Sequence, residues 1–439
     1  MNTFLPEEEF MPHNNHSYKR RLILNIINHL GPISRTELIN LTDYRPASIS
    51  DIIKGLLEEQ LIVETGNYSA GHGRRRTLLE INKTHLCAIG MVFTSNSVNF
   101  IVSQVDGSIL KQDLLKFSPD VGKDILISQI IDCVKILLDT FHNKEILGIG
   151  IGEPHHDPTG YQTGGTLSSD YSHFNDWVHL GLKPRLEELF QLHVEVYSGV
   201  TLPVMAQQHF GVAKGVQNFI CIELSNGIGA SICCNGVPVT GAKGMSGELG
   251  HTVISYGVPN QKLCYCGKPG CVENSTAYPY LIAELKDALN HGVFSTLSTH
   301  LDSNKDITIS AIRKALGEND RLCMYHVKNI AARLGVLIAN TVNLLNPELV
   351  VLYGFMLELG DYFLNQLETS IRENVLSIVE DFEIRISDSL ETILPLGAVA
   401  EIYTSYLRSD DYKWVYQLQP SDLEEWSLIQ GAHSENNHA

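Results

Sequence analysis

Three cysteines and one histidine crowd into a short glycine-rich stretch of this 439-residue sequence. His251 is followed by Cys264, Cys266 and Cys271, so all three thiols fall within eight residues. One imidazole and three thiolates form a ligand set that suits tetrahedral Zn²⁺. Because the protein would fill all four positions, no coordination site remains for water. The spacing therefore predicts a structural zinc ion, which holds a loop in shape, and not a catalytic one.

The alternative is that these are unrelated buried cysteines beside an ordinary histidine. Gly267 and Gly270 favour the zinc interpretation, because they let the chain fold back tightly enough for three sulfurs to converge. By contrast, Cys233 and Cys234 lie in a predicted strand and are expected to serve packing. The motif "HHD" at 155–157 is better explained as a polar loop than as a second metal site.

The sequence predicts a cytoplasmic protein without membrane insertion. Its first ten residues are acidic, whereas a signal peptide begins with a basic segment and an apolar core. The longest apolar stretch, 334–354, is interrupted by asparagines, a proline and a glutamate, so it should not cross a bilayer unaided. Thiols stay reduced in the cytoplasm, which favours metal binding over disulfides for clustered cysteines.

Charge is distributed unevenly along the chain. The formal net charge is −18, which by itself argues against nucleic-acid binding. Residues 13–76, however, hold nine Lys or Arg and six Asp or Glu, a net charge of +3. Residues 77–439 carry the remaining 23 basic and 41 acidic residues. This asymmetry predicts a small basic module attached to a large acidic body.

The basic module has the pattern of a winged helix-turn-helix over residues 1–80. An amphipathic stripe begins near Leu22, Ser34 and Glu37 form a capping-box pattern, and Pro46 can start a third helix. Two strand-like segments follow and would form the wing. The rival interpretation is a small helical bundle that binds proteins, with its arginine run merely solvated. The local basic charge and the arginines of the wing favour DNA.

We expect the third helix to lie in the major groove of a double-stranded DNA operator. Its small side chains would lie near base edges and its lysine near a phosphate. Arginines that follow flexible glycines suit a narrow minor groove. The DNA-binding candidates are Arg35, Arg45, Ala47, Ser48, Ser50, Lys54, Arg74, Arg75 and Arg76.

After the module, strands alternate with helices, and glycines mark the strand ends. This pattern predicts an α/β body of two lobes with a ligand cleft between them. We expect the first lobe at 81–200 and the second, with the zinc loop, at 201–408; its last helix should return to the first lobe. Residues 409–439 form a polar tail to which the sequence assigns no function.

The motifs "GELGH" at 247–251 and "CYCGKPGCVE" at 264–273 resemble the signature of the ROK family of repressors and sugar kinases. The N-terminal module resembles the repressor branch, the Mlc- and NagC-type transcriptional regulators. The resemblance covers about residues 17–403. It implies an actin-like (ribonuclease H-like) sugar-kinase fold of two lobes, assembled as a homodimer or homotetramer.

The resemblance also implies roles for three side chains. Glu248 and Glu273 match family residues that hydrogen-bond sugar hydroxyls, and His251 matches one that both binds zinc and faces the sugar. Carboxylates accept well from neighbouring hydroxyls, and a metal-bound imidazole has a fixed orientation. The alternative for Glu248 is a cap or an ion-pair partner.

Two kinase motifs of the family are missing. Where family kinases carry a phosphate-binding "DxGxT", this chain has Val92, Thr94 and Asn96. Where they carry an Asn-Asp pair with the general base, it has Ser198 and Gly199. Phosphoryl transfer depends on positioned charge and metal, so these replacements predict a protein that is not an enzyme. Replacement of the sugar-gripping Asp also puts ordinary hexose binding in question.

The sequence thus predicts a transcriptional regulator, most simply a repressor of carbohydrate uptake or metabolism genes. Its signal would be a sugar or sugar-phosphate effector in the cleft, or a sugar-transport protein bound to the body. The rival from another class is a ROK-type sugar kinase with a DNA-binding domain, which the missing motifs disfavour.

Overall fold

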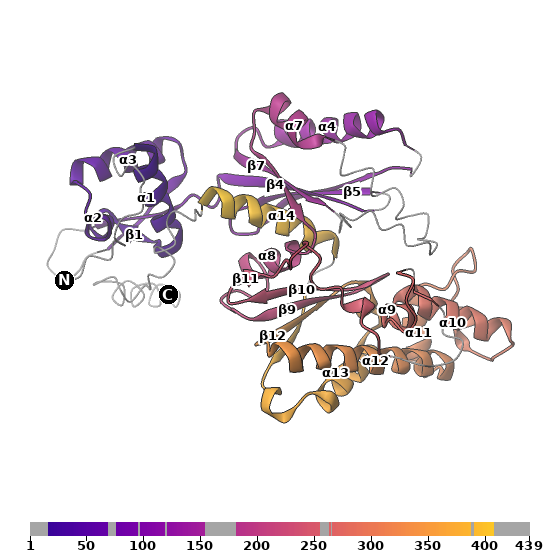
Figure 1. Ribbon diagram of the computed structural model, residues 1–439. Helices are drawn as coiled ribbons and strands as arrows, with labels where there is room; N and C mark the ends of the chain where they lie inside the picture. The colour runs from indigo at the N-terminus through magenta and orange to yellow at the C-terminus, as the bar shows by residue number, and fades with distance from the viewer. Residues whose placement is uncertain are drawn as a thin grey trace, which may run out of the picture.

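The computed structural model describes residues 16–68, 76–94, 97–118, 121–153, 181–254, 263–264, 266–387 and 390–407. Three parts follow one another along the chain: a small N-terminal module and two α/β lobes (Figure 1). Each part has its own sheet, and α14 (Leu390–Leu407) runs from the boundary between the lobes towards the module.

The N-terminal module combines three helices with a three-stranded sheet of order β1-β3-β2. The Ser34 hydroxyl accepts from the Glu37 amide, and the Glu37 carboxylate accepts from the Ser34 amide, so the predicted capping box is confirmed. The third helix begins at Pro46, also as predicted. The elements of the module are α1 His16–Leu30, β1 Ile33–Ser34, α2 Arg35–Thr42, α3 Pro46–Glu58, β2 Ile62–Tyr68 and β3 Arg76–Ile81.

The first lobe is a five-stranded sheet of order β6-β5-β4-β7-β8. Three strands form an antiparallel meander, and β7 and β8 add to it in parallel. Two helices cover one face of this sheet, and α14 lies on the other (Figure 1). The elements of this lobe are β4 Leu86–Phe93, β5 Ser97–Gln104, β6 Ile109–Lys116, α4 Lys123–Thr140, β7 Glu145–Glu153, α7 Leu182–Phe190 and β8 Val194–Ser198.

Two strand glycines let α14 press directly against the first sheet. A Cβ on Gly90 would lie 2.0 Å from the Pro395 carbonyl oxygen, and a Cβ on Gly150 would lie 2.4 Å from the Ala398 carbonyl oxygen. Any side chain at either position would therefore push the helix away. The glycines of β4 and β7 thus explain how a helix from the end of the chain packs on the first lobe.

The second lobe has a five-stranded sheet of order β11-β10-β9-β12-β13, in which β9 and β10 form an antiparallel hairpin and β12 and β13 run parallel to β9. Most helices of the lobe pack against the face opposite the first lobe, whereas α8 (Leu202–His209) lies between the two sheets and packs against α14 (Figure 1). The helices are α8 Leu202–His209, α9 Glu273–Thr276, α10 Tyr278–Asn290, α11 Ile309–Gly317, α12 Arg321–Leu345 and α13 Asp361–Asn374. The strands and 3₁₀ turns are β9 Phe219–Leu224, β10 Ile228–Cys234, β11 Val237–Pro238, η1 Leu249–His251, η2 Thr296–Thr299, β12 Leu349–Tyr353, η3 Phe355–Leu359, η4 Ser377–Val379 and β13 Glu383–Ile386.

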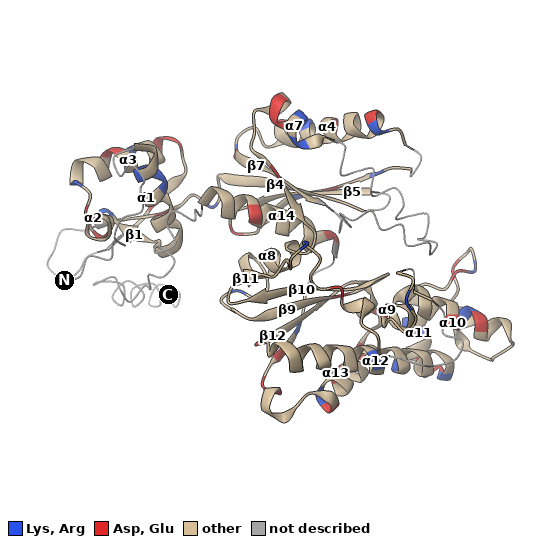
Figure 2. Ribbon diagram, viewed as in Figure 1, with Lys and Arg blue, Asp and Glu red and all other residues tan. Residues whose placement is uncertain are grey.

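Within the described ranges, α12 is the one helix long and apolar enough to cross a membrane. Half of its most apolar window is buried, and its inner residues belong to the main core of the second lobe. The helix is therefore packed as a core helix. Lys, Arg, Asp and Glu occur mainly along the helices and loops, while the strands of both lobes are mostly uncharged (Figure 2).

Candidate functional site

The cysteine-histidine loop is shaped by tight turns on the edge of the second lobe. His251 ends the short turn η1, which follows the backbone bond from the Ala230 amide to the Gly247 carbonyl. Gly267 and Gly270 both adopt left-handed φ angles, 82° and 83°, that favour glycine. The two glycines turn the chain back on itself, as the sequence predicted.

This fold-back brings the four predicted ligands together. The ligand atoms of His251, Cys264, Cys266 and Cys271 all lie within 4.8 Å of one another. Cys264 Sγ is 3.6 Å from His251 Nδ1, and Cys266 Sγ is 3.5 Å from Cys271 Sγ. Ligands of a tetrahedral zinc ion would be about 3.8 Å apart for two sulfurs and about 3.6 Å for sulfur and nitrogen. The cluster can therefore hold a metal ion with little rearrangement.

Burial and mutual proximity affect the thiols of this cluster. Burial raises the pKa of Cys264, and burial together with the neighbouring thiols raises the pKa of Cys271 to about 12. Thiols in such surroundings stay protonated unless a cation stabilises their thiolate form. Cys264 and Cys271 are buried and Cys266 is partly exposed, so a bound cation would be largely shielded from water. The chemistry of the donor set thus fits a metal.

His251 connects this cluster to a carboxylate. Its Nδ1 faces Cys264, while its Nε2 lies 3.6 Å from Glu248 Oε2. A metal-bound histidine usually directs its other nitrogen to a carboxylate or carbonyl, which fixes the ring. Glu248 is 42% exposed, so its carboxylate can contact both the ring and a ligand outside the cluster.

Glu273 fixes the adjacent hairpin. Its Oε2 accepts a 2.9 Å hydrogen bond from the Ile228 amide, at the start of β10. A Cβ on Gly250 would lie 2.8 Å from the same oxygen, and one on Gly227 would lie 3.1 Å away. Both glycines therefore let the carboxylate fit between the hairpin and η1. In the described part of the chain, Oε1 of Glu273 accepts no hydrogen bond.

Two further polar residues lie in the same region, Glu223 of β9 and Ser225 just after the strand, and the sequence analysis overlooked them. Burial raises the pKa of Glu223 to about 7, and the nearby Glu273 carboxylate adds to this shift. Ser225 is 2% exposed, and its hydroxyl opposes the effect of burial by lowering the pKa of the Glu223 carboxylate. The available signal was a lone glutamate in the otherwise apolar strand "FICIEL".

The DNA-binding candidates occupy the start of α3 and its surroundings. Arg45, Ala47, Ser50 and Lys54 are exposed, and Ser48 is partly exposed. Their roles stay predictions. The structure begins β3 at Arg76 and does not describe its side chain; Arg74 and Arg75 lie outside the described residues, as do the "HHD" motif and the C-terminal tail.

Arg35 and Lys54 each face a carboxylate. Arg35 is 3.0 Å from Glu64 of β2, and Lys54 is 3.8 Å from Glu58. Exposed ion pairs of this kind are weak, so a phosphate can displace either carboxylate. Both side chains therefore stay available to DNA.

The positions that match the kinase motifs of the family hold side chains with other roles. Val92 is 3% exposed and packs with Leu202 and Ala398. A hydrocarbon core thus stands where a family kinase has a carboxylate. Ser198 Oγ accepts from the Val200 amide, at 3.4 Å, at the end of β8. Neither Val92 nor Ser198 supplies a charge for phosphoryl transfer.

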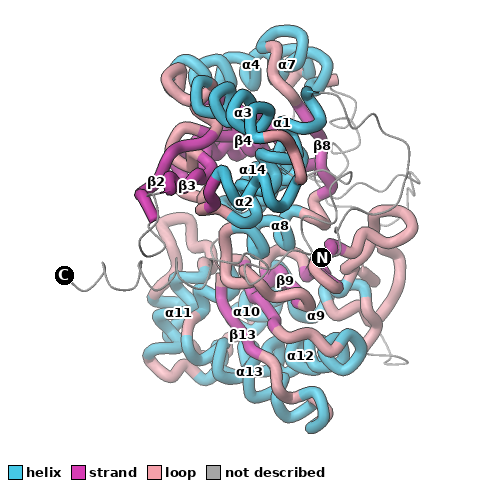
Figure 3. The backbone as a smooth tube through the Cα atoms, turned by 90° about the vertical axis from the view of Figure 1, so that its left-hand side faces the viewer, coloured by secondary structure: helices cyan, strands magenta, loops and turns pink. Residues whose placement is uncertain are grey.

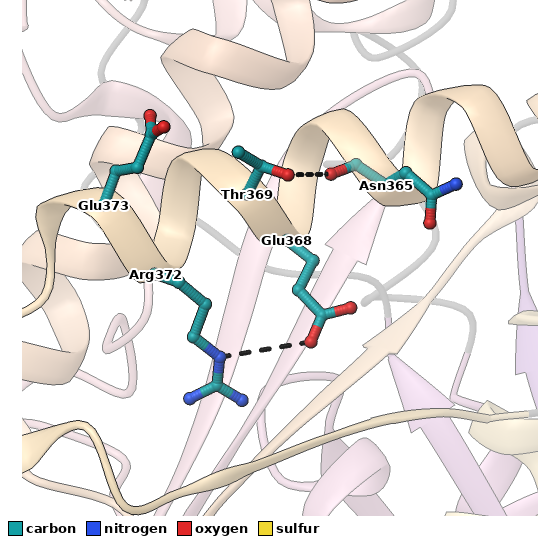
Figure 4. A pocket seen from close by; sticks show the side chains of 5 residues that line it. All are labelled: Asn365, Glu368, Thr369, Arg372 and Glu373. Carbon is teal, nitrogen blue, oxygen red and sulfur yellow. Dashed lines mark hydrogen bonds and ion pairs between the residues drawn. The ribbon is translucent and has the colours of Figure 1, made fainter.

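The described structure also has a surface depression on α13, lined by polar side chains (Figure 4). Thr369 Oγ1 donates to the Asn365 carbonyl, and Arg372 pairs with Glu368 at 4.0 Å. All five lining residues are exposed and come from this single helix. One helix face cannot enclose a small molecule, so we assign it no function.

Comparison with known proteins identifies relatives along most of the chain. The xylose repressor of Caldicellulosiruptor bescii is 27% identical over 396 residues, which covers 89% of this chain and 96% of the relative. The DNA-binding transcriptional dual regulator NagC of Escherichia coli K12 is 25% identical and covers 88% of this chain and 92% of NagC.

Solved structures share the fold. A ROK family transcriptional regulator, a homologue of the E. coli MLC protein, matches with a TM-score of 0.70 at 22% identity, covering 90% of this chain and 98% of that one. A ROK family glucokinase from Streptomyces griseus, in complex with glucose and AMPPNP, matches with a TM-score of 0.57 at 22% identity, covering 71% and 98%. The predicted architecture is thereby confirmed.

The family profile described as "ROK family" matches residues 89–398, from the second half of β4 to the middle of α14. The matched segment includes the whole cysteine-histidine cluster and both lobes. It confirms the membership that the two sequence motifs predicted. This chain belongs to the ROK family.

Proposed function

We propose that this protein is a cytoplasmic DNA-binding transcriptional regulator, and specifically a repressor of carbohydrate uptake or metabolism genes. The observation that carries the proposal is the joining of a helix-turn-helix module with an exposed third helix to a ROK body. The similarity to a xylose repressor across 89% of the chain supports it. The net charge of +3 over residues 13–76 supplies attraction to phosphates.

Helix α14 gives the body a physical connection to the module. Ile393 and Leu396, near its start, pack in the cluster that joins the lobes. Ile402 and Leu407, near its end, belong to the same core as the helices of the module. Tyr403 Oη also donates a 2.6 Å hydrogen bond to the Ser103 carbonyl of β5. A change in lobe closure would thus shift the helix on which the DNA-binding module rests.

In this proposal, an effector in the cleft binds one arrangement of the lobes more tightly than the other. Only such a difference in affinity can move the equilibrium between the two arrangements. The protein acts as a homodimer or homotetramer, so that lobe closure alters the spacing of two winged modules on paired half-sites. A sugar-transport protein bound to the body is the alternative source of the signal.

A structural zinc ion, held by the four-residue cluster, maintains the loop that carries Glu248. Its role when bound is to fix His251 through Nδ1 and thereby the Glu248 carboxylate at Nε2. The loop is polar and rich in glycine, so it has few packing contacts of its own with which to hold this shape.

The proposal is tested with sheared genomic DNA from the source organism. Fragments that the purified protein retains are sequenced, and we expect enrichment upstream of carbohydrate genes. Lys54→Ala should weaken binding to those fragments and lower the slope of log affinity against log salt by about 1. Lys328→Ala removes an equally exposed helical lysine from α12 and should leave both unchanged. Absence of any enriched fragment would contradict the proposal.

Phosphoryl transfer to a sugar is the competing function, and the glucokinase match shows a shared fold only. Buried Val92 and the Ser198-Gly199 pair supply neither a metal carboxylate nor a general base. We therefore expect no ATP-dependent phosphorylation of D-xylose, D-glucose or N-acetylglucosamine. A reproducible phosphorylated product that the native protein forms would overturn this part of the proposal.

A further inference from the structure

One acidic side chain lies in the middle of the exposed face of α3. The buried residues of this helix share the opposite face and are Ile49, Ile52, Ile53 and Leu56. Because an α-helix has about 3.6 residues per turn, the exposed face is centred on Asp51, with Ala47 one turn before it and Lys54 nearly one turn after it. In Figure 3, which views the molecule from the side of the module, no described element of either lobe lies in front of α3. Asp51 is therefore central to the surface that α3 offers to a partner.

Asp51 differs from the glutamates of the module in having no partner. The glutamates among residues 13–76 each face a donor or a cation, in the pairs Glu37–Ser34, Glu58–Lys54, Glu59–Arg20 and Glu64–Arg35. Within the part of the chain that the structure describes, the Asp51 carboxylate forms neither an ion pair nor a hydrogen bond. Its negative charge is thus not balanced by a neighbouring side chain.

The position of Asp51 in the helix gives its charge no strong stabilising role. The helix begins at Pro46, so Asp51 is its sixth residue. The positive end of a helix dipole acts mainly on charges within the first turn. The side chain is also exposed, so it adds no packing to the core of the module. Neither helix electrostatics nor packing explains a carboxylate at this position.

Very small residues lie on both sides of Asp51. Ala47 is four residues before it and Gly55 four residues after it, so both are its neighbours on the helix surface. A Cβ built on Gly55 would meet no atom within 4 Å, so no contact in the described fold requires glycine there. Glycine destabilises a helix interior relative to alanine, but it lets a partner approach the backbone closely. The short Asp51 side chain thus protrudes from a surface that can approach a partner closely.

We propose that Asp51 is a specificity-determining residue of the DNA-binding module, whose carboxylate accepts a hydrogen bond from the N4 amino group of a cytosine in the major groove. The inference rests on the proposed function, because it adds a base contact to the helix that is expected to read the operator. Phosphates repel a carboxylate at every DNA sequence, and a donor on a base edge offsets this repulsion at the matching sequence alone.

Cytosine suits this carboxylate better than adenine, the other base with an amino group in the major groove. The N6 amino group of adenine lies between two acceptors, its own N7 and O4 of the paired thymine. The N4 amino group of cytosine has an acceptor on one side only, O6 of the paired guanine. Guanine and thymine present no donor there. A carboxylate therefore meets the least repulsion at cytosine.

The test is in vitro selection of bound sequences from a randomised double-stranded DNA library with the full-length protein. The native protein should select a motif with cytosine at one position of each half-site, and replacing that cytosine should weaken binding about tenfold. In Asp51→Ala, the preference at that position should be lost while the rest of the motif is retained. The affinity of this variant for a duplex of random sequence should rise, because one negative charge is removed from the interface.

Asp51→Asn and Asp43→Asn form a matched pair, because each removes one exposed negative charge from the module. Asparagine binds N6 and N7 of adenine, so Asp51→Asn should select adenine where the native protein selects cytosine. Asp43 ends α2 with a φ angle of 55°, a conformation that asparagine tolerates, and Asp43→Asn should retain the cytosine. Selection of the native motif by Asp51→Ala or Asp51→Asn would overturn the inference.

The same selection distinguishes failure of this inference from failure of the proposed function. A native motif in which no cytosine depends on Asp51 would overturn the inference and leave the regulator proposal standing. Absence of any selected motif with the native protein would overturn both.

Discussion

The cysteine-histidine cluster and the neighbouring carboxylates Glu223 and Glu273 differ in how their polar groups are arranged. In the cluster, four soft ligands face one another and leave no direction open to a further ligand. Around Glu223 and Glu273, two carboxylates lie near each other beside the open backbone of Gly229, and burial raises the pKa of Glu223 to about 7. The first arrangement is suited to permanent occupancy by a metal, and the second to a proton that binds and leaves as the pH changes.

The largest effect is expected from removing one ligand of the cysteine-histidine cluster. Cys266→Ser should abolish stoichiometric zinc binding and lower the free energy of unfolding by ~3 kcal/mol, about a quarter of a typical structural zinc contribution. Metal content by mass spectrometry and thermal unfolding measure both. Cys133→Ser, at a partly buried cysteine of α4 outside the cluster, is the control. Full zinc occupancy in Cys266→Ser would show that the cluster is not a zinc site.

An effect of similar size is expected from Glu223, and it should depend on pH. The pKa of Glu223 is raised from 4.5 to about 7 in the folded protein, so the folded state binds the extra proton between these values. Its contribution to stability is therefore greatest below pH 4.5 and is lost as the pH rises through about 7. That loss amounts to about 3 kcal/mol.

Glu223→Gln should remove this dependence. At pH 8 the variant should be more stable than the native protein by up to about 3 kcal/mol, and near pH 4.5 the two should converge. Denaturant unfolding across this range gives the difference at each pH. A difference that does not vary with pH would mean that Glu223 has an ordinary pKa and lies in water.

Weakening the contact between Glu248 and His251 is expected to have an intermediate effect. Glu248→Gln weakens the interaction with His251 Nε2, and such outer partners are typically worth 10- to 100-fold in metal affinity. Competition with a chromogenic chelator measures the change. Glu318→Gln alters a comparable pair, with His300 Nε2 at 2.9 Å, remote from the cluster, and should leave zinc affinity unchanged. Equal zinc affinity in Glu248→Gln and Glu318→Gln would mean that Glu248 does not support the metal cluster.

The smallest effect is expected from Ser225. Its buried hydroxyl lowers the pKa of the Glu223 carboxylate, so in Ser225→Ala that pKa should rise further and the loss of stability should occur at higher pH. Denaturant unfolding of the native protein and the variant across this pH range measures the shift. The same pH dependence in both proteins would mean that Ser225 does not contact Glu223.

The sequence predicted the cluster because its information is local. Four ligands within 21 residues, with glycines at the required turns, leave few ways to fold the loop. The helices of the module were equally readable, through the capping box at Ser34 and the proline at the start of α3. In these segments neighbouring residues determine the structure.

The carboxylates Glu223 and Glu273 were only partly predictable as neighbours, because they come together through the fold. Glu223 lies opposite Gly229 through strand pairing, and it lies near Glu273, which begins α9 and is 50 residues further along the chain. No spacing rule connects these positions. The need for glycine in β4 and β7 likewise follows only from the close packing of α14 against these strands. Resemblance to the ROK family named Glu248 and Glu273, whereas the role of Glu223 required the structure.

The central claim is that an effector bound by the two-lobed body controls occupancy of DNA. It is tested most directly by a genome-wide map of protein occupancy in the source organism grown on single sugars. We predict peaks beside carbohydrate genes that disappear on one sugar. Peaks that are identical on every sugar would contradict the claim.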